Sequence, residues 1–398
     1  MIALFLAPVY IVINIYIVKW LIKWLECFSK WFKNKYIKMI IVYIYILFAS
    51  SFIVGFFLPV RWIKVVGNYW LGVVQYIVMT VVIADLIRII LKKCKGINQD
   101  KLSSKMTFLV GGSICILIVA ILSTYGVIHA NKINDTKYEV TIDKENKLNN
   151  LRISLVSDLH LGYNSKIEHI EKMVDIINKN KSDLVVIAGD IFDNEYAAID
   201  RDEEFINALK KIKATYGVYA VYGNHDIEEA ILAGFTFSWK NNVGTSAPEM
   251  DEFLKRANIR LLQVEVVLID DSFYLGGRLD YHKLGIIGLE ERKSPSELLK
   301  EVDKSKPIIM IDHEPKEFKE LESSGVDIDL SGHTHNGQMF PSNVFGKIIW
   351  KNPYGMITVG NMKSIVTSGV GVYGPSMRVG STAEVANILV KFRDENYE

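Results

Sequence analysis

Apolar positions divide this chain into two regions that differ in periodicity. Up to about residue 130, apolar residues follow one another in long, nearly uninterrupted runs. Beyond that point, short apolar runs alternate with segments in which apolar residues recur every three or four positions. Long runs predict membrane-spanning helices, whereas the second pattern predicts buried strands alternating with amphipathic helices. We therefore expect a membrane domain followed by an α/β domain.

The first region, residues 1–130, predicts an all-α membrane domain of about four transmembrane helices. Each apolar segment is long enough to cross the ~30 Å hydrocarbon core, which needs ~20 helical residues. The first segment lacks the basic start and the small-residue cleavage site of a signal peptide. The expected spans are 1–18, 39–60, 65–90 and 108–128.

Charge in the short loops predicts the orientation of this domain. The loop after the first span carries six Lys, and the end of the third span with the loop after it carries six Lys or Arg, whereas the loop after the second carries two. Loops rich in Lys and Arg face the cytoplasm. With four spans, everything after residue 130 then lies on the other side. We expect a multi-pass protein of the cell membrane whose domain after residue 130 is extracytoplasmic.

The second region predicts an α/β fold. Residues 131–150 read as a connector with a first strand, and residues 151–398 as the catalytic domain. Its first part alternates strand and helix, which implies a parallel sheet with covered faces. Its last part is richer in strands, so we expect two sheets between helices, a four-layer αββα sandwich. The strands expected at its start are 138–142, 151–157, 183–188 and 216–221.

Composition narrows the chemistry of the second region. The first 130 residues hold 14 Lys and Arg against three acids, and the remainder holds 32 against 42, a balance of −10. All three cysteines lie in the first region, at Cys27, Cys94 and Cys115. A disulfide framework or a cysteine-based zinc site is therefore excluded after residue 130. A metal there must use imidazole or oxygen ligands.

Metal-type ligands follow five apolar runs of the second region. Open α/β sheets bind ligands at the carboxyl ends of their strands, so these side chains are expected to converge. Five of the eight histidines of the chain lie at these ends. The blocks are Asp158-x-His160, Gly189-Asp190-x-x-Asp193, Gly223-Asn224-His225-Asp226, His313 and Gly332-His333-x-His335.

This ordered series resembles the calcineurin-like metallophosphoesterase family over roughly residues 150–375. A membrane-spanning N-terminus joined to such a domain resembles the YkuE-like group and the transmembrane proteins with a metallophosphoesterase domain. The resemblance implies two divalent metal ions, for which the ligand types allow Mn, Fe, Zn or Mg. It implies a bridging carboxylate at Asp190. It assigns Asp158, His160 and His335 to one metal, and Asn224, His313 and His333 to the other.

The resemblance also implies roles for the remaining polar residues. A hydroxide shared by the metals attacks phosphorus in line, and His225 gives a proton to the leaving oxygen. Asp226 is expected to orient His225, and Asp193 to support a ligand without binding metal. Arg278 and Arg378 are candidate contacts to the substrate phosphate.

The resulting prediction is a membrane-anchored phosphoester hydrolase acting on lipid-linked or cell-envelope phosphoesters, without a nucleic-acid partner. One alternative is a UDP-2,3-diacylglucosamine-type pyrophosphatase that cleaves a phosphoanhydride. Another is a membrane sensor or scaffold that binds metal without catalysis. A transporter is disfavoured because the expected spans hold few polar groups besides Asp85.

Overall fold

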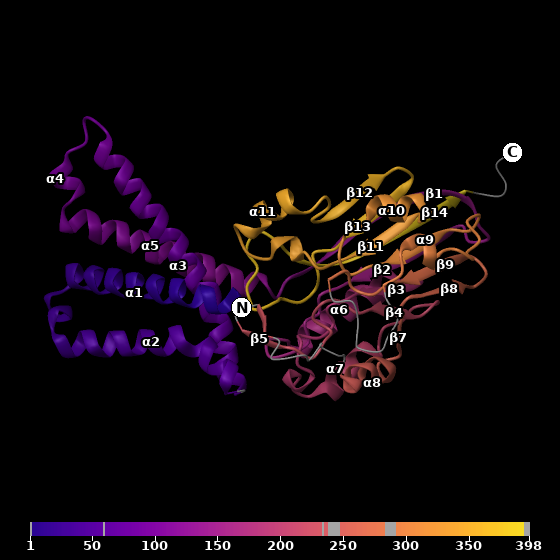
Figure 1. Cartoon of the computed structure of the whole chain (residues 1–398), viewed down its shortest axis with the longest axis horizontal. Coiled ribbons are helices and arrows are strands. Elements are labelled where there is room, and N and C mark those ends of the chain that lie inside the picture. The colour runs from indigo at the N-terminus through magenta and orange to yellow at the C-terminus, as the bar shows by residue number, and fades with distance from the viewer. Residues whose placement is uncertain (1, 59, 233–234, 238–246, 283–291, 394–398) are drawn as a thin grey trace. The chain divides into compact units, whose positions relative to one another are not determined.

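The computed structural model describes residues 2–58, 60–232, 235–237, 247–282 and 292–393. The chain divides into two compact units (Figure 1). The first comprises Met1–Ile128 with two short segments, Ile231–Phe237 and Gly374–Met377. The second contains the rest and carries all the predicted metal ligands.

The first unit is helical, as its uninterrupted apolar runs predict. Three of its helices are long and apolar enough to cross a membrane, namely α2 (Lys35–Phe57), α3 (Arg61–Lys93) and α5 (Lys105–His129). The span expected at 1–18 lies within the longer helix α1 (Ile2–Phe28), and a fourth crossing stays a prediction.

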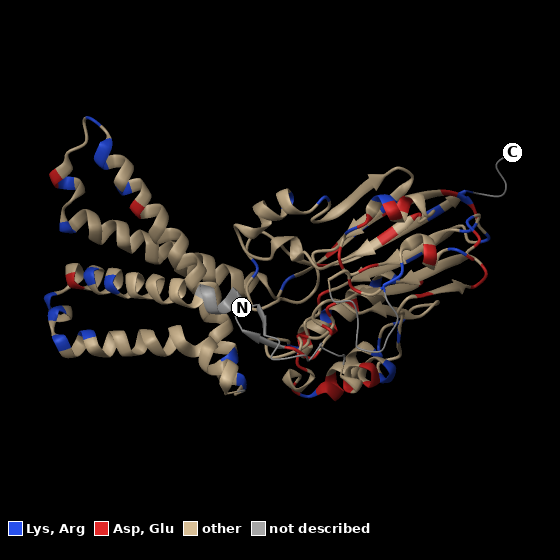
Figure 2. Ribbon diagram, in the orientation of Figure 1, with Lys and Arg blue, Asp and Glu red and all other residues tan. Residues whose placement is uncertain are grey.

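Two short helices connect the long ones at one end of this unit. They are the 3₁₀ helix η1 (Lys30–Lys33), between α1 and α2, and α4 (Gln99–Leu102), between α3 and α5. Figure 2 shows the basic residues of both connections gathered at this end. The two lysine-rich loops therefore lie at the same end of the helical unit, as the charge pattern requires.

The first sheet of the second unit has the order β1-β14-β2-β3-β4-β7. Strands β2, β3, β4 and β7 are parallel, as the strand–helix alternation predicts. β14 pairs in parallel with β1 on one side and antiparallel with β2 on the other, so the sheet is mixed. The strands are β1 (Ile133–Glu145), β2 (Asn150–Val156), β3 (Leu184–Ala188), β4 (Val218–Val221), β7 (Ile259–Leu261) and β14 (Ala383–Arg393).

The second sheet has the order β12-β13-β11-β10-β9-β8 and is also mixed. Its inner strands β9, β10, β11 and β13 are parallel, and its edge strands β8 and β12 are antiparallel to their neighbours. The strands are β8 (Glu265–Ile269), β9 (Phe273–Gly277), β10 (Ile308–Ile311), β11 (Ile328–Ser331), β12 (Gly355–Val359) and β13 (Met362–Val366). A two-stranded pair, β5 (Ala230–Leu232) with β6 (Phe235–Phe237), stands apart from both sheets.

Three buried apolar clusters account for the layers. One lies between the sheets, where Leu155 of β2 and Ile311 of β10 are fully buried. A second packs the outer face of the first sheet against α6 (Ile167–Asn180), α7 (Asp202–Leu209) and α8 (Pro248–Arg256). The third packs the second sheet against α9 (Pro295–Leu298) and α10 (Phe318–Ser323). The catalytic domain is therefore the expected α/β sandwich.

The structure differs from the sequence interpretation in strand order and in elements. Residues 138–142 and 151–157 were expected as consecutive strands, and β14 lies between them. Helix α11 (Ser342–Ile349) and strand β12 were not predicted. Side-chain alternation identifies a strand but not its neighbours, which depend on packing between distant segments.

Candidate metal centre

The predicted ligands come together at the carboxyl ends of the strands. Asp158 and His160 follow β2, Asp190 follows β3, and Asn224 follows β4 in the first sheet. His313 follows β10, and His333 and His335 follow β11, in the second sheet. Both sheets therefore contribute to one site, as the strand-end pattern predicts.

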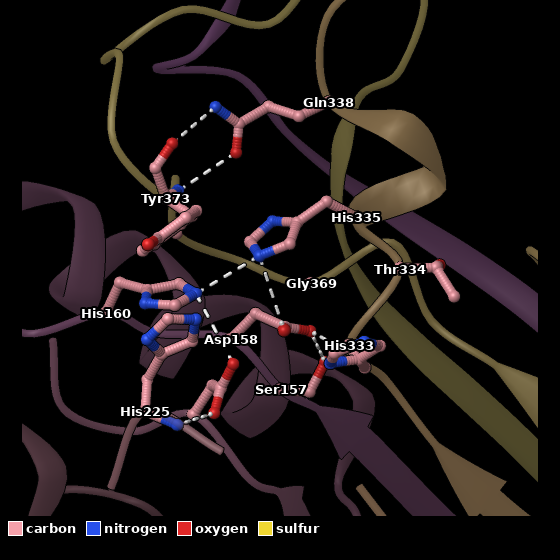
Figure 3. Close-up of polar contacts among 12 residues, drawn as sticks. Ser157, Asp158, His160, His225, His333, Thr334, His335, Gln338, Gly369 and Tyr373 are labelled. Carbon is pink, nitrogen blue, oxygen red and sulfur yellow. Dashed lines mark hydrogen bonds and ion pairs between the residues drawn. The ribbon is translucent and has the colours of Figure 1, made fainter. Parts of the chain in front are cut away.

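The first group consists of Asp158, His160 and His335, all of them buried. His335 Nε2 lies 3.1 Å from His160 Nε2 and 3.4 Å from Asp158 Oδ1 (Figure 3). The Ser157 hydroxyl donates to the other oxygen of Asp158, and His333 N–H donates to it at 3.2 Å. One oxygen of Asp158 is thus held by the protein while the other faces the two imidazoles.

The second group consists of Asp190, His313 and His333, with Asn224 beside them. Asn224 Oδ1 lies 3.1 Å from His313 Nε2 and 2.9 Å from His333 Nδ1. His313 Nδ1–H donates to the Ala188 carbonyl at 2.8 Å, so in the neutral ring the lone pair is on Nε2. A hydrogen bond of this kind fixes the tautomer of a metal-binding histidine.

Asp190 lies between the two groups. Its Oδ2 is 3.1 Å from His313 Nε2 and 3.8 Å from His160 Nε2. Its Oδ1 accepts the backbone N–H of His225 at 2.8 Å. The carboxylate is therefore fixed through one oxygen while the other faces both sets of imidazoles.

These spacings fit metal ions. Metal–ligand bonds of ~2.0–2.2 Å place neighbouring ligand atoms ~3–3.5 Å apart around one ion. Most of the separations above fall in that range. Asp158 Oδ1 and His160 Nδ1 are buried and make no hydrogen bond within the described part of the chain. Unpaired buried polar atoms are costly unless they have another partner, and a cation supplies one for the Asp158 oxygen.

Backbone packing explains the glycines of two motifs. A Cβ on Gly223 would lie 2.3 Å from Asp190 Oδ1, and one on Gly332 would lie 2.2 Å from the Ser157 hydroxyl. A larger residue at position 223 would displace an oxygen of the candidate ligand Asp190. A larger residue at position 332 would displace the Ser157 hydroxyl, which holds the candidate ligand Asp158. These glycines keep the ligand loops in contact.

The ligand backbone is strained. Asp158, His160, Asp190, His333 and His335 all have positive φ, between 45° and 70°. Residues other than glycine in this region cost of order 1–3 kcal/mol each and cluster at functional sites. The rest of the domain must stabilise this arrangement.

Electrostatics within the second group favour a charged carboxylate. Burial alone would raise the pKa of Asp190, but the imidazoles of His313, His225 and His160 bring it well below its usual value. Burial likewise opposes the charged form of His313, yet Asp190 raises the pKa of that imidazole well above normal. Burial lowers the pKa of His333 to about 3, so this side chain is a neutral imidazole, the form that binds metals.

His225 lies beside the ligands with one ring nitrogen occupied. Its Nδ1–H donates to Asn194 Oδ1, and burial lowers the pKa of the ring. Asp226 was expected in this orienting role, and the structure differs. Both Asp226 oxygens accept backbone N–H groups, of Phe192 at 2.8 Å and Gly223 at 2.7 Å. Asn194 was missed, although it directly follows the Asp193 of the same motif.

Tyr373 is a second residue that sequence reasoning missed. Its ring lies 4.3 Å from that of His225 and 5.3 Å from that of His160, between centroids. Gln338 holds its backbone through two reciprocal hydrogen bonds of 2.9 Å (Figure 3). The glycine-rich segment that contains it, residues 368–374, was given no role from the sequence.

The other candidates lie around the ligands. Asp193 Oδ1 is 3.6 Å from His160 Nδ1, on the side of the ring away from His335. Arg278 and Arg378 are buried, and their guanidinium groups contact protein partners. Arg278 pairs with Asp312 and Glu317, and Arg378 donates to the carbonyls of the glycine-rich segment. A substrate contact by either arginine stays a prediction.

A two-sheet sandwich with two groups of candidate metal ligands at its strand ends is an arrangement suited to metal-dependent hydrolysis. Residues 151–337 match the model of the calcineurin-like phosphoesterase family, which supports a hydrolase of phosphoester bonds in this part of the chain. The family resemblance read from the sequence is confirmed.

Several relatives are named as metallophosphoesterases, and one of them is named as a transmembrane protein. A transmembrane protein with metallophosphoesterase domain from Danio rerio is 30% identical over 70% of this chain and 62% of its own length. An uncharacterized metallophosphoesterase of Campylobacter jejuni is 26% identical over 95% of both chains. The metallophosphoesterase YkuE of Bacillus subtilis is 27% identical over 60% of this chain and 79% of its own. The chain thus spans less than two thirds of the Danio rerio protein.

Proposed function

We propose that this protein is a membrane-anchored phosphoester hydrolase that uses two divalent metal ions. The observation that carries the proposal is the position of Asp190, whose Oδ2 faces both groups of ligands. A carboxylate can bridge two ions ~3.5–4 Å apart. Asp158, His160 and His335 would hold one ion, and Asn224, His313 and His333 the other, with Asp190 shared.

The chain's own residues prepare the site for in-line displacement at phosphorus. Two bound ions supply neutralisation of the phosphate charge and acidification of a water molecule. His225 exchanges a proton through Nε2, because Nδ1 is engaged by Asn194. Asn194 fixes the direction of the ring, and Tyr373 packs against it. Because burial lowers the pKa of this ring, Nε2 must first take up a proton from water, and the ring then gives that proton to the leaving oxygen.

The proposed substrate is a lipid-linked or cell-envelope phosphoester. Three apolar helices in the same chain keep the catalytic domain at a bilayer, where such a substrate is concentrated. The loop charges support a catalytic domain outside the cytoplasm. A reporter fused after Glu398 tests this side, and activity of that reporter in the cytoplasm alone would contradict it.

The central test measures hydrolysis of aryl phosphomonoesters, aryl phosphodiesters and a panel of phosphoester lipids by the purified full chain. We expect turnover that a chelator abolishes and that Mn²⁺, Fe²⁺, Zn²⁺ or Mg²⁺ restores. Asp190→Asn and His225→Ala should each lower turnover by at least ~100-fold. Asp143→Asn, at an exposed carboxylate of β1, is the matched control and should leave turnover unchanged. Equal turnover in all four proteins would refute the assignment.

A further inference from the structure

Helix α11 exposes an apolar face next to the metal ligands. Val344, Phe345, Ile348 and Ile349 are 50%, 56%, 79% and 73% exposed. Their spacing places them along one side of the helix. None of the eight residues of α11 is buried, and Figure 1 shows the helix beyond the ends of the strands rather than over a sheet face. The sandwich therefore does not use this face for its own core.

The helix is tied firmly to the site. It follows directly after η3 (His335–Gly337), the 3₁₀ turn that carries one ligand. A Cβ on Gly337 would lie 2.3 Å from the backbone nitrogen of Asn343, so the turn and the helix meet backbone to backbone. Trp350, which ends α11, lies 5.3 Å from the His333 ring between centroids. A partner that binds the exposed face of α11 therefore lies close to two of the metal ligands, His333 and His335.

The segment that carries this face is basic. Residues 330–383 contain no Asp or Glu, within a region whose overall balance is −10, and the cations at α11 are Lys347 and Lys351. Lys347 lies in α11 and Lys351 just after it. Apolar side chains flanked by lysines and a tryptophan are typical of segments that enter the interface of anionic membranes. Three apolar helices of the same chain are long enough to cross a bilayer.

We propose that the apolar face of α11 enters the headgroup region of an anionic phospholipid bilayer. Inserted segments of this type lie ~5–10 Å into the boundary between headgroups and acyl chains. Because η3 and α11 are in backbone contact, insertion places the metal centre at the level of the lipid headgroups. The site is then presented to phosphoesters that are still anchored in the membrane. This inference concerns a surface and can be tested without any turnover.

The test uses the full chain reconstituted in phosphatidylcholine vesicles with and without phosphatidylglycerol. In a background with Cys27, Cys94 and Cys115 replaced by alanine, an environment-sensitive fluorophore is attached at Ile348→Cys. The matched control is Leu268→Cys, an exposed apolar position on β8. Lipids with a nitroxide on the acyl chain report membrane contact, and aqueous iodide reports exposure to water. Hydrolysis of an aryl phosphate by the same samples is measured separately, so loss of activity and loss of membrane contact are distinguished.

We expect the nitroxide lipids to quench the label at 348 at least about threefold more than the label at 268, as insertion of this depth implies. The quenching should grow with phosphatidylglycerol and fall in Lys347→Glu/Lys351→Glu. Equal quenching at both positions overturns the proposal. So does a label at 348 that is shielded from iodide but not quenched by the lipid. That result would identify a second copy, or another segment of this chain, as the cover.

Discussion

Replacement of His225 by alanine tests the proton donor in isolation. The backbone N–H of residue 225, which holds Asp190 Oδ1 at 2.8 Å, is retained in the variant. The ring contributes no ligand to either group, and its Nδ1 is bound by Asn194. The variant should therefore keep its metal affinity and lose only proton donation. That loss is worth ~10²–10⁴ in kcat, or about 3–5 kcal/mol of transition-state stabilisation.

A series of leaving groups separates proton donation from a structural role. We expect the loss in His225→Ala to be largest for alkyl phosphates, whose leaving oxygen needs a proton. It should shrink to ~10-fold or less for nitrophenyl phosphates, whose leaving group departs as an anion. The assay is steady-state hydrolysis across the series, with metal content measured on each sample. A loss that is the same for every leaving group, or that follows loss of metal, would refute the reasoning.

Substitutions at three further positions extend these tests. Asn194→Ala frees the His225 ring and should lower kcat by ~10–100-fold, and Asn194→Asp should restore part of it, measured as hydrolysis of alkyl phosphates. Gly223→Ala places a Cβ 2.3 Å from Asp190 Oδ1 and should lower turnover by ~100-fold while circular dichroism stays unchanged. Burial raises the pKa of Asp329 from 3.8 to about 7, so the folded state binds more protons than the unfolded state between these values. The free energy of unfolding of the natural chain should then fall as pH rises from ~4 to ~7. Asp329→Asn lacks this titration, so thermal unfolding should show it to be more stable than the natural chain by up to ~4 kcal/mol at pH 8, and by less at pH 5.

The grouping of the ligands was predictable because it depends on local features. Each motif directly follows a strongly apolar strand, and carboxyl ends of parallel strands meet at one edge of a sheet. The sequence therefore predicts both groups that the structure brings together around Asp158 and Asp190. The parallel order of β2, β3 and β4 follows from the same alternation of strand and helix.

Side-chain directions in the loops were not predictable in the same way. Asn194 has φ +61°, and this turn directs its amide to His225. The carboxylate of Asp226 instead accepts backbone N–H groups. These two residues belong to different motifs, and motif spacing does not show which of them faces the ring. The insertion of β14 between β1 and β2 was equally hidden, because it is decided by packing between distant segments.

The position of β14 determines when the catalytic domain can form. β14 enters the first sheet between β1 and β2 but follows β2 by more than two hundred residues in the chain. During synthesis, β1 and β2 emerge early, and each exposes an unpaired edge until β14 arrives. Such edges promote pairing between chains. Removal of residues 383–393 would take a central strand from the sheet rather than trim a terminus. Nascent chains of this protein therefore depend on protection of β1 and β2 for as long as it takes to synthesise nearly the whole catalytic domain.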